Sequence, residues 1–134
     1  MTAKPTESRA DMETANEPLG TVGEELAFQF LLKQGYKILI RNYACNLGEI
    51  DLIGKEGGQL VFIEVKTRRS DSMGAPSEAL TFQKRRHIVN TAKAYIQRYG
   101  IQNMSCRFDV VSILMPLAEE PVIGLIRDAF GEGR

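Results

Sequence analysis

Apolar residues recur at helical spacing in two segments of the chain. The first segment runs from about Thr21 to Gln34 and is followed by Gly35, a residue type that commonly ends helices. Thr21 and Glu24 match a capping box, which predicts where this helix begins. The second helix is predicted from about Thr81 to Tyr99. Its predicted apolar face consists of Phe82, Ile88, Ala92, Tyr95 and Ile96.

Shorter runs rich in apolar and β-branched residues predict strands between and after the helices. Three of them precede the second helix and two follow it: Tyr36–Asn42, Glu49–Lys55, Gln59–Arg68, Arg107–Met115 and Val122–Phe130. The last run is predicted as a short edge strand or a tail. The resulting order, α-β-β-β-α-β with an extra β, indicates an α/β fold with a mixed central sheet flanked by helices.

The second and third strands are predicted to form a hairpin around Gly57-Gly58, because both glycines can adopt positive φ angles. If Glu56 pairs with Gln59, Asp51 lies directly opposite Glu64. A four-residue turn would shift this pairing but would keep both carboxylates on the same face. Side chains alternate along a strand, so each face of the hairpin has its own set of residues. One face is predicted to carry Ile50, Leu52, Val61, Ile63 and Val65. The other is predicted to carry Glu49, Asp51, Ile53, Phe62, Glu64 and Lys66.

This second face suggests a metal site. Glu64 lies within an apolar run, where an isolated carboxylate is costly unless it is paired or binds a metal. Asp51 arrives from the neighbouring strand, and a divalent cation would relieve the repulsion between the two groups. Oxygen ligands with open positions suit Mg²⁺ (or Mn²⁺). The predicted ligands are Asp51, Glu64, the main-chain carbonyl of Val65, and Glu24 directly or through water.

The predicted chemistry is hydrolysis of a phosphodiester. A metal held by Asp51 and Glu64 would polarise the phosphate and lower the pKa of a bound water. Lys66 would orient or activate that water, or offset charge developing on the phosphate. Two alternatives stay open. The charged set can be an ordinary salt bridge across a hairpin, and Glu24 can be explained by helix capping, with Glu25 facing inward in its place.

Charge is unevenly distributed although the formal net charge is zero. Between Lys66 and Arg107, nine basic residues face only two acidic ones, a net charge of +7. Such a region attracts phosphates, although runs of charge are also found on solvated helix faces. The predicted nucleic-acid contacts are Arg68, Lys84, Arg85 and Arg86.

Length and composition set the remaining limits. The 134 residues suit one domain, predicted to span residues 19–134, and residues 1–18 are predicted to form a flexible polar tail. Cys45 and Cys106 lie far apart, which favours free thiols in a reducing cytoplasm. No apolar run is long enough to predict a signal peptide or a membrane span.

Several motifs resemble those of the uncharacterised bacterial YraN family. They are VGEELAFQFLLKQGY, RNY, GEIDLIG, VFIEVKTR and RFDVV, which together cover roughly residues 20–130. The resemblance implies a restriction endonuclease-like α-β-β-β-α-β core, similar to that of archaeal Holliday-junction resolvases. In those relatives an acidic residue on the first helix, an Asp and an E-x-K set bind the metal. By position these correspond to Glu24, Asp51, Glu64 and Lys66, although Ile50 stands where the superfamily often has Pro.

The leading interpretation is therefore a cytoplasmic, metal-dependent nuclease that acts on DNA, with branched structures suggested by analogy alone. A second interpretation is a nucleic-acid-binding or partner-recruiting module that keeps the fold with little or no catalysis. A third is a structural protein in which the carboxylates and lysine form a salt-bridge network. A homodimer is compatible with the resemblance, since related resolvases pair to act on two strands.

Overall fold

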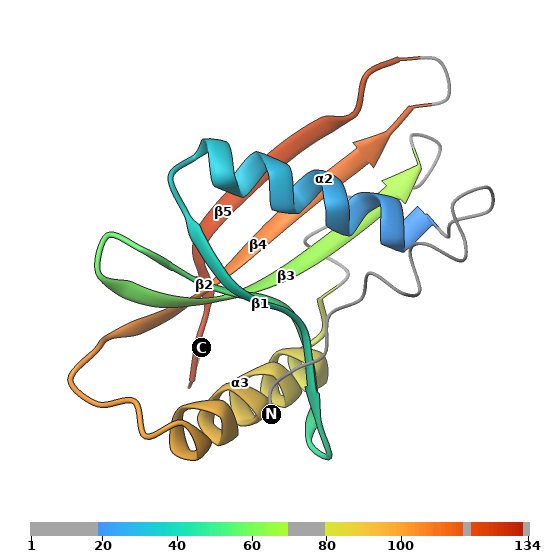
Figure 1. The fold of residues 1–134 in the computed structure, drawn as a ribbon. Helices are drawn as coiled ribbons and strands as arrows, with labels where there is room; N and C mark the ends of the chain where they lie inside the picture. Colours follow the sequence, from blue (N-terminus) through green and yellow to red (C-terminus); the bar gives the residue numbers. More distant parts are fainter. Residues whose placement is uncertain (1–18, 70–79, 117–118, 133–134) are drawn as a thin grey trace, which may run out of the picture.

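The computed structural model describes residues 19–69, 80–116 and 119–132. In this part of the chain, two helices cover opposite faces of one five-stranded sheet (Figure 1). The elements are α2 (Leu19–Lys33), β1 (Lys37–Cys45), β2 (Gly48–Glu56), β3 (Gln59–Arg69), α3 (Phe82–Arg98), β4 (Cys106–Met115) and β5 (Val122–Phe130). The predicted tail, residues 1–18, lies outside the described residues.

The strands lie in the order β1-β2-β3-β4-β5. Neighbouring strands are antiparallel except β3 and β4, which are parallel and are connected through α3. The predicted α/β class and mixed sheet are confirmed. The last segment, which was predicted as an edge strand or a tail, is a nine-residue strand at the edge of the sheet.

Helix α2 ends as predicted but begins earlier. Gly35 has a φ of 99°, and the N–H of Tyr36 donates to the carbonyl of Leu31 at 3.0 Å, so the glycine closes the helix. Thr21 lies inside the helix, which begins at Leu19, and the predicted capping box is therefore wrong. Because the helix begins before Thr21, the N–H groups that Thr21 would have capped can donate to backbone carbonyls of the preceding turn.

Helix α2 packs very closely on β3. A Cβ atom added at Gly23 would lie 2.0 Å from Oγ1 of Thr67. Only glycine permits this approach without a shift of one element. The contact holds the start of α2, including Glu24, next to the sheet.

The β2–β3 hairpin follows the predicted register. Gly57 and Gly58 have φ angles of 59° and 85°, and the ladder runs from Glu56–Gln59 to Leu52–Ile63. It ends there, one pair before Asp51 and Glu64 would face each other. Beyond this point β2 leaves β3 and continues alongside β1 toward α3 (Figure 1).

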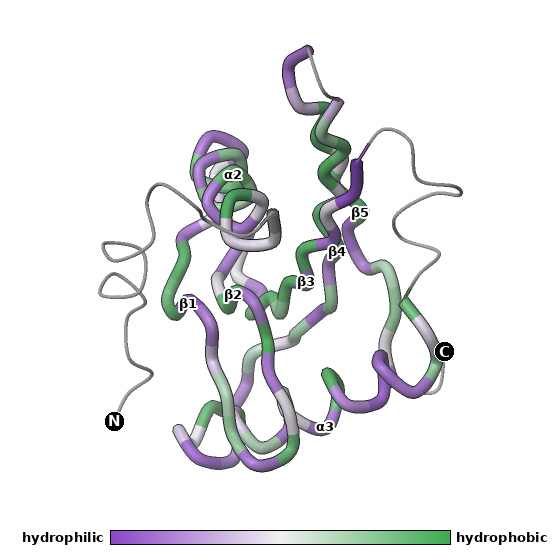
Figure 2. Tube along the Cα trace, turned by 90° about the vertical axis from the view of Figure 1, so that its right-hand side faces the viewer, coloured by the Kyte–Doolittle hydropathy of each residue, from purple (hydrophilic) through white to green (hydrophobic). Residues whose placement is uncertain are grey.

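The two faces of the sheet carry separate apolar cores, between α2 and the sheet and between α3 and the sheet (Figure 2). Leu52, Val61 and Ile63 pack on the α2 side, as the alternation predicted. Ile50 was predicted to share that face but packs on the α3 side with Ile53. The alternation fails where β2 has left β3 and pairs with β1 alone, opposite Asn42 of β1, whose φ is 58°.

Helix α3 lies across the other face of the sheet, with Thr81 as its N-cap. Four residues of its predicted apolar face are buried or packed against the core: Ile88, Ala92, Tyr95 and Ile96. The fifth, Phe82, is 60% exposed, so its assignment to that face is wrong. Ile88 lies six positions after Phe82, so the two side chains point about 240° apart around the helix axis.

Two further properties follow from the described residues. Cys45 and Cys106 are free thiols, as predicted. Neither α2 nor α3 is long and apolar enough to cross a membrane.

Candidate metal centre

Two carboxylates from neighbouring strands line one cavity at the point where β2 leaves β3. The cavity has a volume of about 420 Å³ and lies against the first turns of α3. It is lined by Gly48, Glu49, Asp51, Glu64, Thr81, Gln83, Lys84, His87 and Ile88. The prediction that Asp51 and Glu64 share one face of the hairpin agrees with this placement.

Asp51 takes over a backbone hydrogen bond where the strand pairing stops. The N–H of Val65 donates to Oδ2 of Asp51 at 2.8 Å. This N–H lies beyond the last pair of the β2–β3 ladder and would otherwise lack a partner on β2. The bond fixes the Asp51 carboxylate at the gap between the strands.

The surroundings of Asp51 disfavour its negative charge. Burial of the carboxyl group raises the pKa of Asp51 well above its usual value, and the nearby charge of Glu64 raises it further. The hydrogen bond from Val65 opposes this rise, as does the charge of Lys84, whereas the charge of Glu24 adds to it. A cation beside Asp51 and Glu64 would therefore be favoured.

Glu64 has a cationic partner that sequence reasoning placed elsewhere. Its residue surface is only 6% exposed, and its Oε2 lies 3.1 Å from Nζ of Lys84. Lys84 was predicted as a nucleic-acid contact, not as a partner of Glu64. The helix start positions it, because the N–H of Lys84 donates to Oγ1 of Thr81 at 3.1 Å.

The spacing of apolar residues along α3 contained part of the information that was missed. Ile88 is buried, and Lys84 lies one helical turn before it on the same side of α3. Thr81 and His87 also line the cavity from this side. Because the predicted apolar face included Phe82, the prediction placed part of the wrong side of α3 against the sheet and did not bring Lys84 near Glu64.

Lys66 does not take the predicted place beside the carboxylates. It is half-buried, pairs in register with Ser112 of β4 and is not one of the residues that line the cavity. No ion pair joins it to another residue of the described ranges. Within the described ranges no salt bridge joins Lys66 to Asp51 or Glu64, so the alternative of a carboxylate–lysine salt bridge across the hairpin is not found there.

The two acidic residues of α2, Glu24 and Glu25, have different surroundings in the structure. Glu25 is exposed and binds Arg41 at 2.8 Å and Gln29 at 3.0 Å. Glu24 is half-buried, and its charge acts on Asp51. Within the described residues, no three His, Cys, Asp or Glu side chains are gathered so that they could hold a metal by themselves. Water and substrate oxygens would have to complete the shell around Asp51 and Glu64.

The other predicted nucleic-acid contacts lie outside the cavity. Arg68 is half-buried in β3, in register with Leu114. Arg85 donates to the carbonyl of Leu80 at 3.2 Å, and the guanidinium of Arg86 lies 5.9 Å from the ring centre of Phe82. Arg85 and Arg86 follow the outer side of α3.

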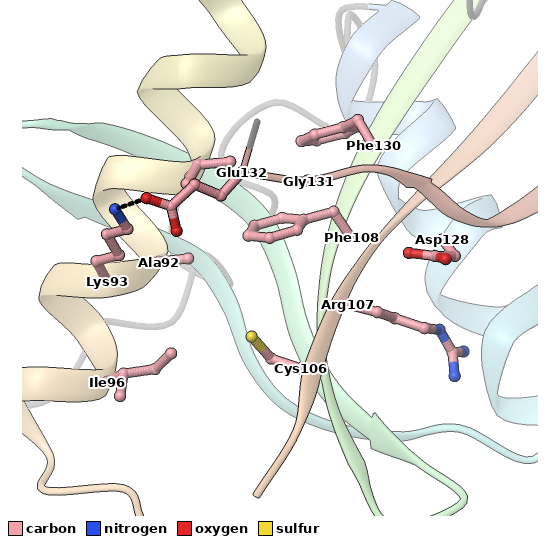
Figure 3. A pocket seen from close by; sticks show the side chains of 11 residues that line it. Ala92, Lys93, Ile96, Cys106, Arg107, Phe108, Asp128, Phe130, Gly131 and Glu132 are labelled. Carbon is pink, nitrogen blue, oxygen red and sulfur yellow. Dashed lines mark hydrogen bonds and ion pairs between the residues drawn. The ribbon is translucent and has the colours of Figure 1, made fainter. Parts of the chain in front are cut away.

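A second cavity, of about 300 Å³, lies between α3 and the ends of β4 and β5 (Figure 3). Phe108 and Phe130 form much of its wall, with their ring centres 5.1 Å apart. Its acidic residues do not converge, because Asp128 and Glu132 lie on opposite sides of β4 in this view. This cavity therefore lacks the paired carboxylates of the first.

Asp109 is a buried carboxylate with a structural environment. It is fully buried and accepts hydrogen bonds from the Tyr36 hydroxyl at 2.7 Å, from Nε of Arg107 at 2.9 Å and from the N–H of Asp128 at 2.9 Å. Both carboxylate oxygens are thus satisfied by the protein. The structure therefore gives Asp109 a hydrogen-bonding role within the fold and not that of a metal ligand.

The order of elements, with β3 and β4 parallel in a five-stranded mixed sheet, is consistent with a restriction endonuclease-like core. Comparison with known proteins identifies the family. Residues 23–113 match the model of the uncharacterised protein family UPF0102, and the chain belongs to this family, also called YraN.

Individual relatives agree over nearly their whole length. A UPF0102 protein of Caldicellulosiruptor saccharolyticus is 51% identical over 113 residues, covering 84% of this chain and 96% of the relative. One from Geotalea daltonii is 42% identical over 122 residues, covering 91% and 96%. One from Clostridium botulinum strain Loch Maree is 43% identical over 121 residues, covering 89% and 98%. Their names state the family and no activity.

Proposed function

We propose that this protein is a metal-dependent nuclease that hydrolyses phosphodiester bonds of DNA. The observation that carries the proposal is the meeting of Asp51 and Glu64 in one cavity beside a cationic side chain. Two acidic groups whose mutual repulsion raises the pKa of one of them are a costly arrangement for a fold to keep. Such arrangements concentrate at functional sites.

The donor set suits Mg²⁺ or Mn²⁺. Asp51 and Glu64 would hold the ion through carboxylate oxygens, with the Val65 carbonyl and Glu24 as further predicted ligands. Hard oxygen donors with positions left for water and phosphate are what these ions prefer. When bound, the ion would supply Lewis-acid stabilisation of the phosphate.

The other residues of the cavity would bind and orient the substrate. The side chain of Lys84 is 48% exposed, so its ammonium group can meet a phosphate oxygen while remaining near Glu64. Gln83 and His87 line the same opening and can donate hydrogen bonds to the backbone of a bound strand. Lys66 lies two positions after Glu64 in β3 and would contact the bound nucleic-acid strand outside the cavity.

One observation favours a second function, that of a nucleic-acid-binding module without catalysis. Lys84 already neutralises Glu64 at 3.1 Å, so the cavity is less negative than two free carboxylates would make it. A module of this kind would keep the basic surface and bind DNA through it. Its binding would fall steeply with salt, and no strand would be cut.

A cleavage panel separates these functions. Labelled duplex, single-stranded, flapped and four-way DNA, with matched RNA, would be incubated with Mg²⁺ or Mn²⁺. We expect cutting of at least one DNA substrate, and its loss in Asp51→Asn and Glu64→Gln, which preserve shape and remove charge. Equal behaviour of the wild type and these two variants on every substrate would refute the nuclease proposal.

Two matched pairs sharpen the same assay. Glu24→Gln should reduce cutting, whereas Glu25→Gln, one position along the same helix, should leave it unchanged. Lys84→Ala and Lys66→Ala show which lysine serves the reaction. The geometry predicts the larger loss for Lys84→Ala, because Lys84 lines the cavity and Lys66 does not.

A further inference from the structure

A third cavity, of about 260 Å³, lies on the outer side of α3. We call it the stacking pocket. Among the residues that line it are Phe82, Arg85, Arg86, Asn90, Lys93 and Glu132. The first turns of α3 separate it from the carboxylate cavity. Thr81, Lys84 and His87 face that cavity, whereas Phe82, Arg85 and Arg86 face the stacking pocket.

Phe82 has no evident role in the fold. It is the first residue of α3, and its surface is 60% exposed. The Thr81 side chain caps the helix, so Phe82 is not needed for that role. A flat apolar ring left in solvent is a contact surface for a ligand with an aromatic face of its own. The Arg86 guanidinium lies 5.9 Å from its ring centre and adds a cation beside it.

The pocket is positively charged. Arg85, Arg86 and Lys93 stand against the single carboxylate of Glu132, a net charge of +2. Lys93 is bound to Glu132 at 2.5 Å, and Figure 3 shows this pair bridging α3 and the end of the chain. Nε of Arg85 is enclosed and has no hydrogen-bond partner within the described ranges.

We propose that the stacking pocket binds one unpaired nucleotide of a nucleic-acid strand. Its base would stack on Phe82, and Arg85 and Arg86 would hold the adjoining phosphate. An acidic peptide would satisfy the cations but would leave the Phe82 ring uncovered, so the nucleotide is the better match. The inference rests on the proposed function in taking nucleic acid as the ligand, and it deepens that function by naming the substrate class.

The two cavities then act on one strand. They flank the same turns of α3, so a strand crossing the helix start would present a phosphate to Asp51 and Glu64 and a neighbouring base to Phe82. A base inside a continuous duplex is stacked on its neighbours and cannot reach Phe82. Substrates with an unpaired nucleotide beside the cleavage point, such as flaps, gaps and single strands, would be preferred.

The test is a binding measurement in EDTA, where no cutting occurs. Fluorescence anisotropy would follow a labelled oligothymidylate and a labelled duplex titrated with the full chain. Phe82→Ala should weaken oligothymidylate binding about 5- to 150-fold, since stacking contributes about 1–3 kcal/mol per base. Duplex binding should stay within about twofold, because a paired and stacked base cannot reach Phe82. Phe82→Trp should retain tight binding to the single strand.

Tyr99 provides a matched control. It lies at the other end of α3, is 42% exposed and has the Arg98 guanidinium 5.7 Å from its ring centre. Tyr99→Ala should leave oligothymidylate binding unchanged. Equal weakening of single strand and duplex by Phe82→Ala, or no weakening of either, would overturn the inference. Displacement of oligothymidylate by oligoglutamate at equal concentration would also overturn it, by assigning the pocket to an acidic peptide.

The outcomes of this test and of the cleavage panel are independent. If Phe82→Ala selectively weakens single-strand binding and no substrate is ever cut, the inference holds and the nuclease proposal fails. If DNA is cut and Phe82→Ala changes neither binding nor cutting, the nuclease proposal holds and the stacking pocket fails.

Discussion

Replacing Asp51 with asparagine should make the metal-free protein more stable. The amide oxygen of Asn can still accept the hydrogen bond from Val65, which measures 2.8 Å in the native protein. The substitution removes a negative charge that burial and the charges of Glu64 and Glu24 oppose. A residue whose replacement stabilises the fold is kept for another reason, and the proposed reason is metal binding.

The expected gain is about 1–2 kcal/mol at neutral pH, typical of stabilising single substitutions. Two opposing effects produce it. A hydrogen bond to a charged acceptor is about 1 kcal/mol stronger than one to a neutral acceptor, so Asn loses that much. Burial and the like charges of Glu64 and Glu24 disfavour the Asp51 carboxylate by more than this, and the charge of Lys84 offsets only part of that cost. For a domain of this size the gain would raise the Tm by about 4–8 °C.

The pH dependence has a definite sign. Because the folded-state pKa of Asp51 lies above its usual value of 3.8, the folded protein binds this proton more tightly than the unfolded chain does. Wild-type stability therefore falls as the pH rises from 3.8 through the raised pKa and stays lower above it. The Asp51→Asn variant does not show this fall in stability, because asparagine does not titrate. The two proteins should be nearly equal in stability at acid pH and differ fully at neutral pH.

Thermal and urea denaturation, with and without Mn²⁺, would measure these effects. A ligand at 100 times its Kd stabilises the folded state by about 2.7 kcal/mol, so Mn²⁺ should stabilise the wild type and leave Asp51→Asn unchanged. If metal-free Asp51→Asn is less stable than the wild type at neutral pH, the repulsion argument is wrong. Equal stabilisation of both proteins by Mn²⁺ would place the ion elsewhere.

Three further predictions concern the fold. Arg107→Met should destabilise the protein by about 3–5 kcal/mol in urea denaturation, because Asp109 would be left buried without its ion pair; a loss below about 1 kcal/mol would contradict the reasoning. Arg127 and Arg107 lower the pKa of Glu56 to about 2, so the wild type should lose stability as the pH falls from 4.5 toward 2, and Glu56→Gln should show a flatter acid limb. Gly23→Ala should cost about 1–3 kcal/mol by overpacking, and adding Thr67→Ala should recover part of the loss; simple additivity of the two changes would argue against the contact.

Much of the fold could be predicted because local rules decide it. The Gly57-Gly58 turn fixes the hairpin register, and the pairing from Glu56–Gln59 to Leu52–Ile63 follows from it. The helices follow from apolar spacing, and Gly35 ends the first one as expected. These elements depend on residues close together in the sequence.

The features that sequence reasoning missed depend on contacts between distant segments. Ile50 packs on the α3 side at the point where β2 has left β3 and follows β1. The pairing of Lys84 with Glu64 depends on how α3 crosses the sheet, which spacing along the helix cannot supply alone. The role of Lys66 stays a prediction, because Lys66 does not line the cavity that Asp51 and Glu64 share.

The location of a bound Mn²⁺ ion tests the central claim most directly. Anomalous diffraction from crystals grown with Mn²⁺ would show its position without reference to activity. We predict a peak about 2.1 Å from carboxylate oxygens of both Asp51 and Glu64, a separation typical of small divalent ions with oxygen ligands. A peak that contacts neither residue, or only one of them, would contradict the claim that the two strands build one metal centre.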